Sequence, residues 1–115
     1  MDEQDKARTR TILGDDNYAR WSTATIAILN KEDYKLWRDH LDPAIPQPVV
    51  PNGNANLATF YKAEATCMAA LVSSIDENNF NRVSTVLAPA DPVAHPTPSR
   101  DAWVALRDYH LSQGE

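Results

Sequence analysis

The spacing of apolar residues along the chain predicts five helices. Apolar side chains recur every three or four residues in five segments, which is the spacing that places them on one face of an α-helix. Glycine is scarce while alanine and leucine are plentiful, and this composition favours helices over a sheet. We therefore expect an all-α fold, a compact bundle of about five helices over residues 17–30, 31–40, 57–75, 77–87 and 98–111.

The first expected helix follows a turn and carries two large aromatic residues. Gly14 suits the turn, and residues 15–17 are acidic or amide side chains of the kind that cap the first N–H groups of a helix. Tyr18 and Trp21 lie three residues apart, so a helix places them side by side. Residues 12–13 are expected to pack back on this helix. The expected buried stripe is Tyr18, Trp21, Thr25, Ile28 and Leu29.

The third helix has the widest apolar arc, which predicts that it is the central one. Its stripe contains one charged residue, Glu64, which we expect at the solvent edge. Phe60 widens the arc beside the stripe, which consists of Leu57, Tyr61, Met68, Leu71 and Ile75. The expected faces of the second, fourth and fifth helices are Tyr34, Leu36, Trp37 and Leu41; Phe80, Val83 and Leu87; and Ala102, Trp103, Leu106, Tyr109 and His110.

Two proline-rich segments, residues 43–56 and 88–98, separate the expected helices. Their prolines exclude a helix or a central strand. We expect surface connections, with recognition of a partner as the alternative for a proline-rich sequence. Residues 52–56 predict a turn with an asparagine that caps the next helix. Thr97 suits the N-cap of the last helix, and Pro98 suits its first position.

The chain is long enough for one modest core. We expect a flexible N-terminal arm over residues 1–11, a single helical domain over residues 12–111, and a frayed C-terminus over residues 112–115. The sequence shows no internal repeat.

Three short motifs resemble, in order, the N-terminal capsid region of the Gag polyprotein of copia-type LTR retrotransposons. The first is a Leu-Gly-x-x-Asn-Tyr-x-x-Trp opening, the second is a Leu-Trp step, and the third is an Ala-Trp-x-x-Leu-x-x-Tyr segment. Together they span most of the chain. The sequence departs from the family where Phe60 and Tyr61 replace a tryptophan that is common near the start of the third helix. The matching residues are Leu13, Gly14, Asn17, Tyr18 and Trp21; Leu36 and Trp37; and Ala102, Trp103, Leu106 and Tyr109.

The resemblance implies a structural, non-enzymatic role. Capsid lobes of the family self-associate into a capsid or virus-like particle, so the expected partners are further copies of the chain or other Gag chains. The Cys-rich knuckle with which many Gag proteins hold RNA is absent from this sequence and would follow downstream in a full-length Gag. The chain is then either a piece of a longer Gag or a short host-encoded relative. The alternative is a domesticated Gag-like lobe that acts as a protein-interaction module, by binding a peptide or by interfering with capsid assembly.

Charge and composition limit the other functions. The net charge is −5 and the acidic residues are spread along the chain, so we expect no direct nucleic-acid binding. The only basic cluster, residues 6–10, is expected to be a solvated chain end. No apolar run is long enough for a signal peptide or a membrane span. A single cysteine excludes an intramolecular disulfide, and we expect a reducing intracellular, cytoplasmic location.

The sequence offers no positive evidence for an enzyme. His40, His95 and His110 are far apart in sequence, so we expect no metal site and no cofactor. Cys67 lies in an apolar helical pattern and is expected to be an inert core residue, although pairing with a histidine such as His110 is the one nucleophile arrangement to test. The carboxylate pairs at residues 15–16 and 76–77 are expected to cap helices.

Overall fold

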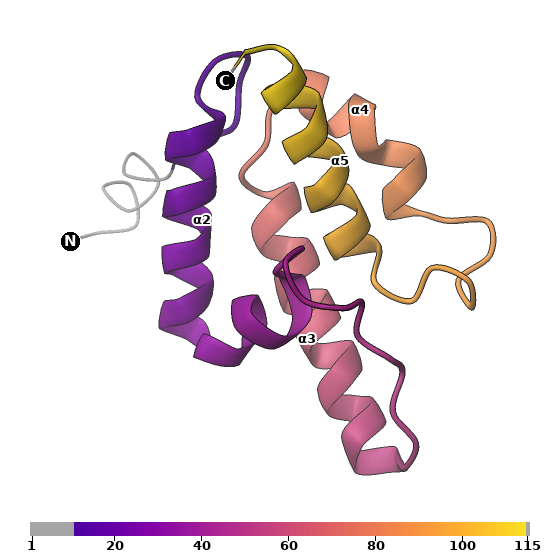
Figure 1. Ribbon diagram of the computed structural model, residues 1–115. Coiled ribbons are helices and arrows are strands. Elements are labelled where there is room, and N and C mark those ends of the chain that lie inside the picture. Colours follow the sequence, from indigo (N-terminus) through magenta and orange to yellow (C-terminus); the bar gives the residue numbers. More distant parts are fainter. Residues whose placement is uncertain (1–10, 115) are drawn as a thin grey trace.

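The computed structural model describes residues 11–114, and in this range the chain is all-helical. The expected flexible arm falls on residues 1–10, outside the described part, apart from Thr11. In residues 11–114 the only β-structure is an isolated bridge between Leu13 and Ile75. The all-α prediction is therefore confirmed. The helices are α2 (Tyr18–Glu32), the π-helix η1 (Leu36–Leu41), α3 (Asn54–Val72), α4 (Glu77–Leu87) and α5 (Pro98–Ser112) (Figure 1).

Helix α5 holds the bundle together. It packs against α4, α3 and η1, while α2 packs against η1 and α3. Figure 1 shows α5 between α2 and α4, with the N-terminal end of α3 projecting beyond the other helices. Trp103 of α5 stacks on Trp21 of α2 with 4.7 Å between ring centroids, and Trp37 of η1 meets Trp103 edge-on at 5.0 Å. Three helices therefore share one aromatic core.

The turn before α2 is anchored to the connection between α3 and α4. The backbone N–H of Leu13 donates to the carbonyl of Ser74 at 2.8 Å, and the N–H of Asp76 donates to the carbonyl of Leu13 at 3.0 Å. Leu13 is fully buried as expected, whereas Ile12 is exposed. Asn17 occupies the N-cap position but does not cap α2 with its side chain. Its amide oxygen instead accepts the N–H of Gly14 at 2.8 Å, so it closes the turn.

The structure corrects the expected faces of the first two helices. Helix α2 buries its aromatic stripe, but Ile28 is 42% exposed because it lies at the edge of the buried arc, about 100° around the helix from Leu29. Helix α2 continues to Glu32, beyond its expected end at residue 30, and η1 begins at Leu36 instead of at the expected residue 31. The π-helix η1 closes with a hydrogen bond from the N–H of Asp42 to the carbonyl of Trp37, five residues earlier. Tyr34 precedes η1 and is 57% exposed, contrary to the prediction.

Helix α3 is shifted and rotated relative to the prediction. It begins at Asn54, and Gly53 occupies the N-cap position with a φ of 95°, in the left-handed region that favours glycine, so no asparagine caps it. It ends at Val72, because the following residues pair with the turn at Leu13. Tyr61 is 55% exposed and faces away from the core. The buried face consists of Phe60, Cys67 and Leu71.

The last two helices match their predicted bounds closely. Helix α4 starts and ends as expected, and a carboxylate oxygen of Asp76 caps it by accepting the N–H of Asn79 at 2.9 Å. Phe80 is half-exposed, whereas Asn79, which the apolar pattern did not include, is fully buried. Helix α5 begins at Pro98, as predicted, but the hydroxyl of Thr97 makes no cap hydrogen bond. Tyr109 is also half-exposed.

The aromatic core predicts the cost of losing one of its rings. Replacing Trp103 with alanine removes a side chain that is 2% exposed and contacts two other tryptophans. We expect the free energy of unfolding to fall by about 3–5 kcal/mol, measured by urea denaturation. The exposed Tyr34→Ala variant is the control and should change it by less than about 0.5 kcal/mol. Equal losses in the two variants would contradict this description of the core.

Candidate functional site

The residues of the three sequence motifs build the interior and the turn, and they do not form one exposed site. Leu13, Tyr18, Leu36 and Leu106 are buried, as are Trp21 and Trp103, and Trp37 packs against this core. Gly14 and Asn17 form the turn, and Tyr109 is half-exposed. Tyr18, Trp37 and Trp103 also border a depression of about 280 Å³ at the surface.

A buried asparagine links the motif segments through hydrogen bonds. The side-chain N–H₂ group of Asn79 donates to the carbonyls of Leu13 and Gly14, each at 3.1 Å. Its oxygen accepts from Nε2 of His110 at 2.8 Å and from Arg82 at 2.8 Å. The imidazole of His110 also stacks on the ring of Tyr18, with centroids 5.7 Å apart. Asn79 therefore connects the turn, α4 and α5, and no apolar spacing signals it in the sequence.

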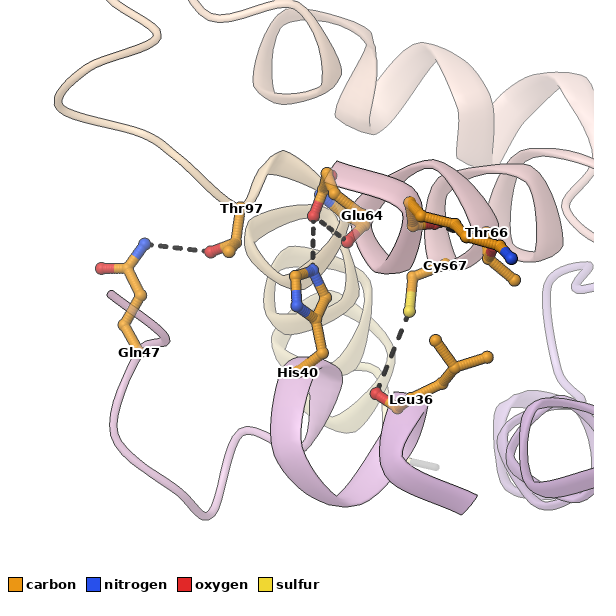
Figure 2. A network of polar contacts seen from close by, with 9 residues as sticks. Leu36, His40, Gln47, Glu64, Thr66, Cys67 and Thr97 are labelled. Atoms are coloured by element: carbon orange, nitrogen blue, oxygen red, sulfur yellow. Dashed lines mark hydrogen bonds and ion pairs between the residues drawn. The ribbon is translucent and has the colours of Figure 1, made fainter. Parts of the chain in front are cut away.

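The most polar cluster of the interior centres on Glu64 of α3. Nε2 of His40 in η1 donates to Oε1 of Glu64 at 2.9 Å (Figure 2). The hydroxyl of Ser99 donates to the same oxygen at 2.7 Å, and the backbone N–H of Ser99 donates to Oε2 at 2.9 Å. The side chains of His40 and Glu64 are only 6% and 12% exposed. The prediction of Glu64 at the solvent edge is therefore wrong, because partners from η1 and α5 enclose it.

The geometry of this cluster is that of a clamp between helices. In nucleophilic catalysis a base accepts the proton of the serine hydroxyl and a carboxylate orients that base. Here the carboxylate is in the middle, the hydroxyl of Ser99 donates to it directly, and Ser99 is fully buried. Glu64 also accepts an N–H at the N-terminus of α5, where a negative charge is favoured. The cluster fixes the start of α5 against α3 and η1.

Cys67 is buried beside the same cluster. Its sulfur faces the carbonyl of Leu36 at 4.0 Å, as Figure 2 shows, and its side chain is fully buried. Burial, with the nearby carboxylate of Glu64, raises the pKa of Cys67 to about 12. The thiol is therefore protonated at neutral pH and enclosed, which agrees with the prediction of a core cysteine. Within residues 11–114, no three His, Cys, Asp or Glu side chains lie together in a way that would hold a metal ion.

A largely apolar concave surface, which we call the loop groove, lies between the two proline-rich loops. It has a volume of about 610 Å³, within the range of ligand-binding pockets. Residue Val50 comes from the first loop, Tyr61 from α3, and Pro92, Val93 and Pro96 from the second loop. Val93 is 90% exposed although it is aliphatic. The sequence predicted both loops as surface segments, but the groove between them arises only from the fold.

No protein-family model, curated protein or solved structure matches this chain. Within residues 11–114, every helix is too short or too polar to cross a membrane.

The Glu64 clamp predicts that the enclosed carboxylate of Glu64 contributes far more to stability than an exposed carboxylate does. Replacing Glu64 with alanine leaves the buried groups of His40 and Ser99 without their acceptor, so unfolding should require about 3–5 kcal/mol less free energy. In the control Asp39→Ala, the lost pair with Arg38 has side chains that are 52% and 59% exposed, and the urea midpoint should barely move. Similar midpoints for the two variants would refute the clamp.

The buried thiol predicts a dependence of stability on alkaline pH. Because the folded state raises the pKa of Cys67 above its unfolded value, the unfolded state loses the thiol proton first. The contribution of the protonated Cys67 thiol to stability is fully present below about pH 9. Above that pH, the titration of this thiol should lower the free energy of unfolding by about 1.4 kcal/mol per pH unit. The Cys67→Ala variant has no thiol at this position, so its free energy of unfolding lacks this dependence on pH. The difference in the free energy of unfolding between the wild type and Cys67→Ala should therefore narrow or reverse from pH 8 to pH 10. A difference that stays constant over this range would contradict the prediction.

Proposed function

We propose that this protein is a structural, non-enzymatic domain that resembles a Gag capsid N-terminal lobe and self-associates into larger assemblies. The observation that carries the proposal is the place of the motif residues. Tryptophans from all three motifs, Trp21, Trp37 and Trp103, meet in one core. The motifs therefore act together to specify the fold, which is the role that the resemblance to copia-type Gag implies for them.

The surface supports this proposal by leaving apolar side chains exposed on several helices. Ile28 on α2, Val72 on α3 and Phe80 on α4 are between 36% and 42% exposed. Exposed apolar residues on three different helices offer contacts for neighbouring molecules, which closed or extended assemblies require. The proposal includes a cytoplasmic location and further Gag chains as partners.

A second candidate function is a protein-interaction module, and the loop groove favours it. A groove of about 610 Å³ with an exposed aromatic ring and proline walls has the features of a peptide-binding surface. In this case the domain would bind a partner segment or interfere with the assembly of intact Gag chains. The two candidates differ in whether the main partner is the same chain.

Self-association predicts a mass that rises with protein concentration. Sedimentation velocity over a roughly hundredfold range of concentration should show a weight-average mass that increases beyond that of the monomer, because mass action favours assembly. Phosphate at high concentration should enhance the effect by strengthening apolar burial. Electron microscopy should then reveal ordered particles. A monomer at every concentration in both buffers would reject self-assembly by this domain alone and would move the interaction module to first place.

A further inference from the structure

The loop groove continues into a second, more acidic depression. This depression has a volume of about 370 Å³ and shares Pro89 and His95 with the groove. Asp91 and Asp101 line it, whereas none of the lysines and arginines within residues 11–114 lines either part. The combined surface therefore has an apolar part beside Tyr61 and an acidic part beside Asp101.

The charge of the acidic part is only weakly compensated by the protein. Nδ1 of His95 lies 3.8 Å from a carboxylate oxygen of Asp101, beyond hydrogen-bond distance. Burial raises the pKa of Asp101 above its usual range, and the neighbouring His95 and Arg100 offset this only in part. The carboxylate of Asp91 accepts backbone N–H groups of its own loop from Val93 and Ala94, at 3.1 and 3.3 Å. A cation brought by a ligand would lower the energy of both carboxylates.

The walls of the groove favour a ligand that supplies hydrogen-bond donors. Pro89, Pro92 and Pro96 of the second loop line the surface, and a proline offers a carbonyl but no N–H. An extended peptide presents its backbone N–H groups to a neighbour, whereas a helix uses them internally. The wall therefore suits an extended segment better than a helix.

Contacts between the loops and α5 hold the groove in shape. The side chain of Gln47 donates to the hydroxyl of Thr97 at 3.0 Å, which ties the first loop to the end of the second (Figure 2). Nη2 of Arg100 donates to the backbone carbonyl of Ile45 and lies 3.4 Å from that of Pro43. Binding to a surface that is already ordered costs less conformational entropy.

We propose that this surface binds an extended, apolar segment of a partner protein that carries a lysine or arginine. The apolar side chains of the segment pack against Tyr61, Val50 and Val93, and its cationic side chain reaches Asp91 and Asp101. This inference rests on the second candidate function, the interaction module, and names its ligand class and its site.

Selection from a library of random linear peptides displayed on phage, with the whole chain immobilised, tests the proposal. We expect enrichment of sequences in which a lysine or arginine accompanies two or more aliphatic or aromatic residues. The most enriched sequence is then synthesised, and its dissociation constant is measured by fluorescence anisotropy. The Tyr61→Ala variant should bind it about tenfold more weakly, a loss typical of an aromatic contact at the centre of an interface.

Isosteric variants separate the role of charge from that of shape. Asp91→Asn and Asp101→Asn should each weaken binding several-fold, and added salt should weaken the wild type more than either variant. The control is Tyr34→Ala, which removes an equally exposed aromatic ring outside the groove and should bind as the wild type does. Unfolding curves of all variants establish that they are folded.

Several outcomes would overturn the proposal. These are a selection without enrichment, enrichment of acidic sequences, and binding that Tyr61→Ala leaves unchanged. Enrichment of sequences that match this chain itself would also reject a separate partner and would assign the groove to a second copy. Sedimentation reports on self-association separately, so a failed selection with a concentration-dependent mass rejects the groove ligand and leaves the capsid-like function standing.

Discussion

The stacking of Trp21 on Trp103, with Trp37 at the edge, is the contact on which the rest of the structure depends. The three rings come from α2, η1 and α5, so one cluster fixes α5 against two helices that are far from it in the sequence. Large aromatic side chains contribute more buried apolar area than any other residues, which matters in a chain with room for only one modest core. The indole N–H of Trp21 donates to the hydroxyl of Ser74 at 3.0 Å, so burial leaves this polar group satisfied.

Two buried polar residues fix parts of the chain that the aromatic core does not contact. Glu64 joins η1, α3 and the start of α5, and Asn79 joins the first turn to α4 and α5. Each satisfies several groups at once, and a polar group that loses its partner inside a protein is costly. Such groups tolerate few alternative packings. They therefore fix the register of the helices more sharply than apolar contacts, which adapt to small shifts.

The consequence for function is a division between interior and surface. Most motif residues are used in the core and in the turn, so the surfaces available to a partner consist mainly of other residues. Among them, the loop groove combines an exposed aromatic ring with rigid proline walls, and the adjoining depression adds two weakly compensated carboxylates. Assembly through helix faces and recognition through the loops use different parts of the molecule, so the two proposed functions do not exclude each other.

The sequence by itself determined the number of helices and most of their ends, but not that the second one is a π-helix. Periodic apolar residues predicted the helices, the prolines predicted the loops, and Asp76 and Pro98 marked the starts of α4 and α5, because these are local properties of the chain. Only the tertiary structure decided which side of α3 is buried. The apolar arc of α3 is wide enough for two orientations of the helix. Whether the side with Tyr61 or the side with Glu64 faces the interior depends on partners from η1 and α5. The roles of Asn79 and the loop groove were likewise invisible in the sequence, because hydrogen bonds and cavities between distant segments leave no periodic signal.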